Sequence, residues 1–91
     1  MNISENGLAI NKRFFHTIDV LKQMRRIRGL QTFTRAYNIN YGNMHTTRTM
    51  PDKKSLKPEW LAHLVLDFGV SAKYLLTGIG PMFENAKEVE K

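Results

Sequence analysis

Apolar residues recur at steps of three and four along much of this chain, which is the spacing of one face of an α-helix. A first run predicts a helix over residues 12–28, which Gly29 ends. A later run predicts a helix that begins at Pro58, because proline suits the first helical turn, and that ends at Gly69. The apolar faces of these two helices are formed by Phe14, Ile18, Leu21, Met24, Trp60, Leu61, Leu64, Val65 and Phe68.

Shorter helices are predicted from the residues that cap them. We expect helices over residues 30–37 and 41–48, since Asn38 tolerates the left-handed conformation that ends a helix and Asn40 is a good N-cap. Ser71 similarly predicts the start of a last helix, which Gly78 ends. No segment alternates polar and apolar residues as a strand does. The expected fold class is therefore all-α, with five helices.

The segment Gly29–Arg48 places two of these helices on either side of a very short polar turn. Its apolar side chains are spaced to pack against one another, which favours a steep angle between the helices. That arrangement is a helix-turn-helix, whose second helix usually enters a major groove of DNA. The packing residues are Phe33, Thr34, Tyr37, Ile39 and Met44.

The length of 91 residues indicates one domain. We expect a flexible N-terminal arm over residues 1–11, the folded domain over 12–83 and a charged, frayed tail over 84–91. The chain has no cysteine, no apolar run near the roughly 20 residues that span a bilayer, and no signal-peptide pattern. A cytoplasmic location is expected.

The net charge of +6 is distributed unevenly along the chain. Residues 1–57 hold 11 Lys and Arg against three acids, whereas residues 58–91 hold three against five. So basic an N-terminal part favours an anionic partner such as nucleic acid, with a solubilising basic surface as the alternative. The same two interpretations stay open for Arg25, Arg26 and Arg28, which suit either phosphate contact or the C-terminal dipole of a helix.

Two runs of the chain are characteristic, FTRAYNINYGNM and FGVSAKYLLTGIGPMF. Through them residues 12–83 resemble the lambda-repressor-like helix-turn-helix family. The first run is similar to a variant found in regulators from Bacteroidetes and their phages, and the second is the more specific match. The resemblance implies a five-helix DNA-binding domain that acts as a transcriptional regulator. It also implies a homodimer, formed through the fifth helix and residues 79–83, on a pseudo-palindromic duplex.

The resemblance also implies which side chains contact DNA. Base contacts fall on the start of the third helix, and phosphate contacts on the residues around it. Leu30 occupies the place where the family often has glutamine, so Gln31 beside it is expected to take that role. The implied base contacts are Tyr41, Gly42, Asn43, His45 and Thr46, and the implied phosphate contacts are Gln31, Arg35, Arg48, Lys53 and Lys54.

The chemistry of a catalytic or metal site is not evident. His16, His45 and His63 are scattered, and no nucleophile motif or glycine-rich phosphate loop occurs. We therefore expect no enzyme, no metal and no cofactor. Two binding functions compete with DNA recognition. One is a protein-interaction module on the same fold, in an antitoxin or anti-repressor role, with a contact through Ile79, Met82 and Phe83. The other is an RNA binder that stacks bases on exposed aromatic rings.

Overall fold

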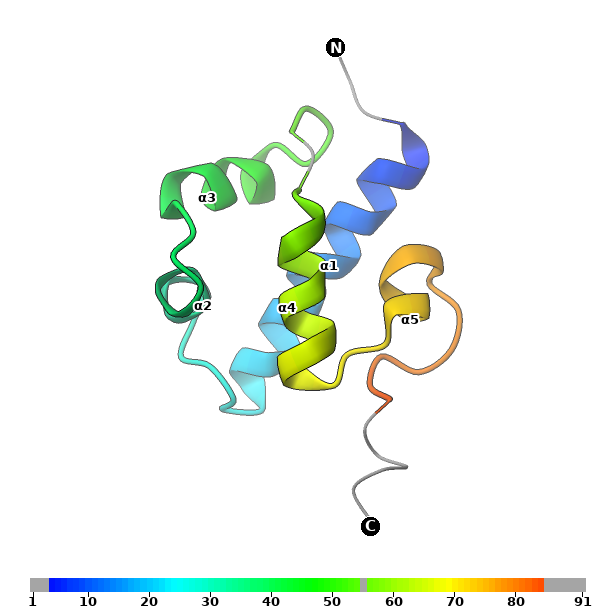
Figure 1. Cartoon of the computed structure of the whole chain (residues 1–91). Helices are drawn as coiled ribbons and strands as arrows, with labels where there is room; N and C mark the ends of the chain where they lie inside the picture. The colour runs from blue at the N-terminus through cyan, green and yellow to red at the C-terminus, as the bar shows by residue number, and fades with distance from the viewer. Residues whose placement is uncertain (1–3, 55, 85–91) are drawn as a thin grey trace, which may run out of the picture. The chain divides into compact units, whose positions relative to one another are not determined.

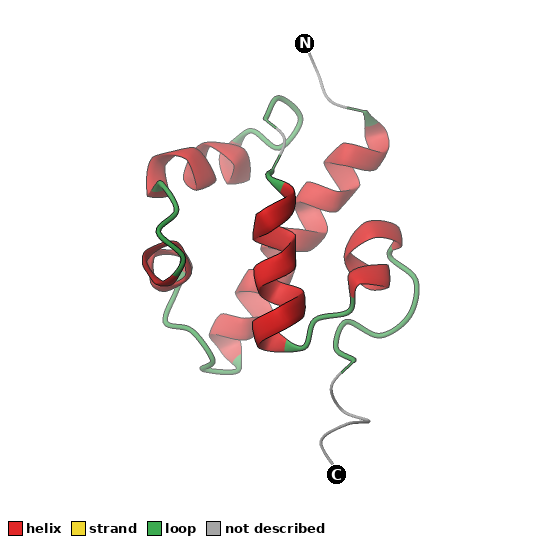
Figure 2. Cartoon of the chain, in the orientation of Figure 1, coloured by secondary structure: helices red, strands yellow, loops and turns green. Residues whose placement is uncertain are grey.

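The computed structural model describes residues 4–54 and 56–84, and in this part of the chain it contains five helices and no strand (Figure 2). The all-α prediction is confirmed. The chain divides into two compact units, Met1–Leu56 and Lys57–Lys91. The helices, labelled in Figure 1, are α1 (Glu5–Gln23), α2 (Leu30–Ala36) and α3 (Tyr41–Thr49) in the first unit, and α4 (Pro58–Phe68) and α5 (Ala72–Thr77) in the second.

Helix α1 begins well before residue 12, so the predicted flexible arm is wrong for residues 5–11. Ser4 provides the N-cap, because its Oγ accepts a hydrogen bond from the Gly7 N–H at 3.0 Å. Glu5 lies in the first turn, where a negative charge suits the helix dipole. Residues 1–3 of the predicted arm lie outside the described residues.

The end of α1 also differs from the prediction, because the helix stops at Gln23 rather than at residue 28. The Arg25 N–H donates to the Lys22 carbonyl at 3.0 Å, and the Arg26 N–H donates to the Leu21 carbonyl at 2.9 Å. These two bonds form a Schellman motif, which requires a left-handed residue, and Arg25 adopts a φ of 64°. Such a φ costs a residue other than glycine about 1–2 kcal/mol.

Two sequence predictions at this end are consequently wrong. Gly29 does not end α1, and it lies instead at the N-cap of α2 with an extended φ of 170°. Met24 is not part of the buried face, since it follows the last helical turn and its residue is 48% exposed. The other three predicted face residues, Phe14, Ile18 and Leu21, are fully buried as expected.

The core of the first unit joins its three helices. Phe14 of α1 meets Phe33 of α2 edge-on, with ring centroids 6.0 Å apart. Met44 of α3 is fully buried, and α3 packs against both α1 and α2. Figure 1 shows α2 nearly end-on and α3 from the side, so the two helix axes are steeply inclined. Phe33, Thr34 and Met44 are buried as predicted, whereas Tyr37 and Ile39 are half-buried.

The turn between α2 and α3 has the predicted local chemistry. Asn38 adopts a left-handed φ of 55°, which an asparagine tolerates well. The Asn40 Oδ1 accepts a hydrogen bond from the Asn43 N–H at 2.8 Å and caps α3. The Ile39 N–H donates to the Thr34 carbonyl at 2.8 Å, which ties the turn to α2.

In the second unit, α4 packs against α5. Gly69 and Gly78 end these helices with φ values of 69° and 78°, as the sequence predicts. The Ser71 Oγ accepts a hydrogen bond from the Tyr74 N–H at 3.1 Å and caps α5. On the inner faces Trp60, Leu64 and Leu75 are buried, whereas Leu61, Val65 and Phe68 of α4 are half-buried.

After α5 the chain returns to the junction between the two helices of this unit. Val70 and Phe83 form an isolated antiparallel bridge, and the Ser71 N–H donates to the Met82 carbonyl at 2.7 Å. The Glu84 N–H donates to the Gly69 carbonyl at 2.8 Å. Glu84 therefore belongs to this returning segment, while residues 85–91 of the predicted tail lie outside the described residues.

Candidate nucleic-acid interface

Helix α3 has one buried side and one exposed side. Met44 and Thr47 are buried, with exposed fractions of 0% and 1%, and they fix the inner side of the helix. The residues between and before them face away from the unit because a helix repeats every 3.6 residues. The outer side carries all of the predicted base contacts, of which Tyr41, Gly42, Asn43 and His45 are exposed and Thr46 is half-buried.

The side chains of this outer face differ in how free they are. Tyr41 and His45 stack on each other, with ring centroids 5.7 Å apart and planes inclined by 17°. The Thr46 hydroxyl donates to the Gly42 carbonyl at 2.8 Å, so its hydrogen is used and its methyl group remains for contact. The Asn43 amide has no side-chain hydrogen bond within the described residues, which leaves its donor and acceptor available.

A hollow of about 250 Å³ lies where α2 meets the start of α3. It is lined by Gln31 and Arg35 of α2, by Asn38 in the turn and by Tyr41 of α3, among other residues. Two predicted phosphate contacts and one predicted base contact thus lie together. A cation beside an exposed helix start is the arrangement that accepts a phosphate.

Arg48 lies apart from this group and is held against α1. Its Nη2 contacts both carboxylate oxygens of Asp19, at 2.8 and 3.1 Å. Its guanidinium carbon also lies 5.8 Å from the centre of the Phe15 ring. Because the side chains of Arg48 and Asp19 are 37% and 47% exposed, the pair contributes less than about 1 kcal/mol to stability. These contacts join α3 to α1, and a phosphate contact by Arg48 stays a prediction.

The loop after α3 carries Lys53 and Lys54, which are both exposed. This loop is fixed by Asn11, a buried residue of α1 that sequence reasoning missed. The Asn11 Nδ2 donates to the carbonyls of Pro51 and Lys54, both at 2.8 Å, and its Oδ1 accepts from the Leu56 N–H at 3.3 Å. Ser4, a good N-cap followed by Glu5, is the sequence feature that could have placed Asn11 in a helix.

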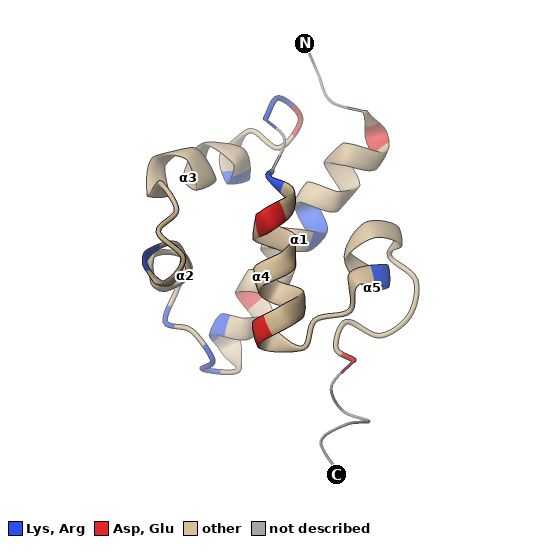
Figure 3. Ribbon diagram, in the orientation of Figure 1, with Lys and Arg blue, Asp and Glu red and all other residues tan. Residues whose placement is uncertain are grey.

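Basic residues lie on several neighbouring elements of the first unit. Figure 3 shows Lys and Arg positions on the turn after α1, on α2 and on the loop after α3.

Over residues 4–54 and 56–84 no group of His, Cys, Asp and Glu is placed to hold a metal ion. None of the described helices is both long enough and apolar enough to cross a membrane. His16 and His45 are exposed and His63 is half-buried.

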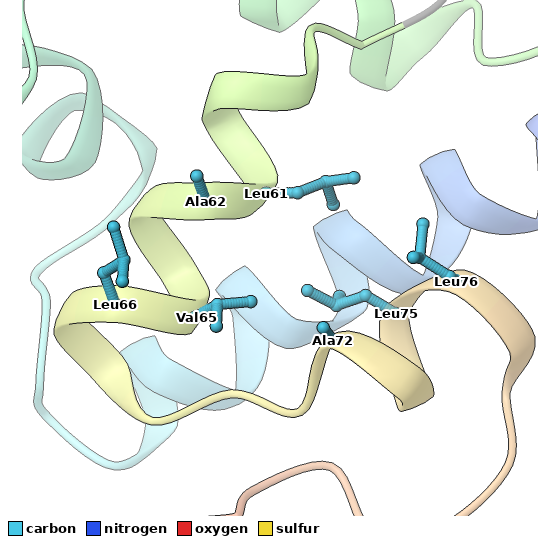
Figure 4. Close-up of a pocket in the computed structure, with 7 residues that line it drawn as sticks. All are labelled: Leu61, Ala62, Val65, Leu66, Ala72, Leu75 and Leu76. Atoms are coloured by element: carbon cyan, nitrogen blue, oxygen red, sulfur yellow. The ribbon is translucent and has the colours of Figure 1, made fainter.

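The second unit has a different surface, an aliphatic groove of about 300 Å³ between α4 and α5 (Figure 4). Leu66 and Leu76 at this groove are 79% and 51% exposed. Ile79 is 59% exposed, whereas Met82 and Phe83 are half-buried. The groove is lined by Leu61, Ala62, Val65, Leu66, Ala72, Leu75 and Leu76.

Comparison with known proteins does not identify a family. No family model matches the chain, and neither the curated proteins nor the solved structures contain a match.

Proposed function

We propose that this chain is a sequence-specific regulator that binds duplex DNA through a helix-turn-helix of the lambda-repressor type, formed by α2 and α3. The observation that carries the proposal is the outer side of α3. There a tyrosine, an asparagine and a histidine are exposed on a helix whose opposite side is buried. A rigidly held helix with a polar outer face is the element that enters a major groove.

The chemistry of this face matches base recognition. The Asn43 amide offers a donor and an acceptor, which is the pattern that an adenine edge requires. The Thr46 methyl suits the methyl group of thymine. Gly42 has no side chain, and its backbone lets a groove wall approach closely. Tyr41 stands at the entrance of the helix, where its hydroxyl suits a phosphate oxygen.

The surrounding cations suit the DNA backbone. Arg35 lies in the hollow beside Tyr41, and Lys53 and Lys54 lie on the loop that follows α3. Phosphate contacts on both sides of a recognition helix hold the protein in register without selecting a sequence. We assign Gln31 to the same role, because it lines the hollow with Arg35.

A dimer completes the proposal. We place its contact on α5 and residues 79–83, with the aliphatic groove of the second unit as part of the same surface. Exposed leucines around an aliphatic groove are typical of a protein–protein contact. Two recognition helices in such a dimer contact half-sites about 34–36 Å apart.

One alternative is favoured by the same groove. If the groove binds a different protein, the chain is an interaction module, and the outer face of α3 then serves a partner rather than DNA. The RNA-binding alternative has less support, since stacking on single strands needs several free aromatic rings. Tyr41 is 42% exposed, but it already stacks on His45.

Fluorescence anisotropy with a labelled random-sequence duplex, titrated with salt, tests the proposal. Phosphate contacts by Arg35, Lys53 and Lys54 alone contribute about −2.7 per bound protomer to the slope of log affinity against log salt, so the measured slope should be at least that steep. The matched single strand should bind more weakly. Equal binding to the duplex and to the single strand would favour the RNA-binding alternative. No binding to either probe would favour the interaction module.

A further inference from the structure

The turn that joins α1 to α2 is more basic than the fold requires. Lys22, Arg25 and Arg28 are exposed, and with the buried Ile27 they line a hollow of about 410 Å³. No acidic side chain lines this hollow. None of these three cations forms an ion pair with another residue of the described chain. Three like charges around one hollow repel each other, and an anion between them removes that cost.

The backbone makes the choice of arginine unusual. Arg25 occupies the left-handed position of the Schellman motif that ends α1, a position that glycine normally takes. Elsewhere the chain follows that rule, with Gly69 and Gly78 at the ends of α4 and α5 and Asn38 in the turn after α2. The side chain of Arg25 also lines the basic hollow.

Compensation of the helix dipole does not explain the arrangement. Lys22 already places a cation in the last turn of α1, where it suits the dipole. The carbonyls of Leu21 and Lys22 are already bonded to backbone N–H groups of the motif. Arg25 and Arg28 lie beyond the last turn, where the effect of the dipole has fallen away.

We propose that this basic turn, residues 22–28, is a second phosphate-binding surface for duplex DNA. This inference rests on the proposed function and extends its contact area. Arg28 comes three residues before Gln31, which lines the hollow between α2 and α3. Figure 3 shows basic positions following one another from the end of α1 through the turn to α2. The phosphates bound by the turn therefore adjoin those bound by α2.

The decisive variant is Arg25→Gly, because glycine suits the backbone and removes only the charged side chain. We expect its melting temperature to equal or exceed that of the wild type. Its DNA binding should be weaker than that of the wild type at low salt, with a salt slope smaller by about 0.9 for each bound protomer, so that the difference between the two affinities narrows about eightfold per decade of salt. Arg28→Gln should produce a similar loss without a change in melting temperature.

The matched control is Lys12→Gln, which removes an exposed cation from the same helix about 15 Å from Lys22 along its axis. It should leave both the salt slope and the affinity for duplex unchanged. A loss of affinity in Arg25→Gly that is equal on duplex and single strand would overturn the assignment to duplex DNA. So would unchanged binding in both turn variants. If the wild type itself does not bind duplex, the proposed function fails and this inference fails with it.

Discussion

A single buried amide explains how an exposed loop acquires a fixed shape. Asn11 is 1% exposed, and it holds Pro51, Lys54 and Leu56 through two donated hydrogen bonds and one accepted hydrogen bond. The Lys54 backbone is one of the bonded positions and Lys53 precedes it, so the amide fixes the backbone that carries these two cations. The sequence alone does not reveal this role, because an asparagine between Ile10 and Lys12 resembles any polar residue of a surface helix. Its partners lie about 40 residues away.

Replacing Asn11 should therefore be costly. Asn11→Leu has a similar volume but leaves two carbonyls and one N–H without their partner, and we expect unfolding to become easier by about 2–4 kcal/mol. Asn11→Asp keeps the acceptor for the Leu56 N–H but turns a carboxylate toward the carbonyls of Pro51 and Lys54, so it should also destabilise. Urea unfolding measures both. An Asn11→Asp variant as stable as the wild type would contradict the hydrogen-bond account.

At the scale of the helix, prediction succeeds where the deciding chemistry is local. Asn40 and Ser71 cap the helices that follow them, and Gly69 and Gly78 end the helices that precede them, because each choice depends on a few neighbouring residues. The end of α1 was not predictable in this way. The start of the helix is marked locally by the Ser4 cap, which the apolar spacing alone did not reveal, and its end depends on an arginine in a position that glycine normally takes. The exposure of the outer face of α3 was predictable from the sequence. The ion pair between Arg48 and Asp19 was not, because its two residues are 29 positions apart and only the folded structure brings them together.

Helix α2 begins without a side-chain cap, so adding one tests whether local capping residues stabilise the helices of this chain. Gly29 is its N-cap, its φ of 170° suits any residue, and an added Cβ would meet nothing within 4 Å. Gly29→Ser should stabilise the chain by about 0.5–1 kcal/mol, through a new cap and a less flexible unfolded chain. Gly29→Ala should gain only the stabilisation that comes from a less flexible unfolded chain, because alanine has no side-chain oxygen to cap the helix. Equal stabilisation of both variants in urea unfolding would contradict a capping contribution.

The whole chain separates charge from apolar surface along its length. Residues 1–57 carry the basic excess, and the aliphatic groove belongs to α4 and α5. This separation suits the proposed regulator, which binds DNA with one part and a second copy with another. Leu66 is the natural probe of the second part, since it lies at the groove and is 79% exposed, so a charge there leaves the fold intact.

Leu66→Glu should weaken self-association without lowering the melting temperature. Sedimentation velocity should show a concentration-dependent dimer for the wild type and a monomer for the variant. Affinity for a duplex with two half-sites should fall, while affinity for a single half-site should not change. A wild type that stays monomeric up to high concentration, with or without DNA, would contradict a dimer through this surface.

The central claim, that the outer face of α3 recognises a DNA sequence, is tested most directly by selection from random duplexes. Wild-type protein is compared with the Tyr41→Ala/Asn43→Ala double variant, whose two side chains are exposed and carry no core packing. The account predicts that the wild type enriches a two-fold-symmetric sequence and that the variant, still folded and still binding duplex through its cations, enriches none. Enrichment of the same sequence by both proteins, or by neither, would contradict it.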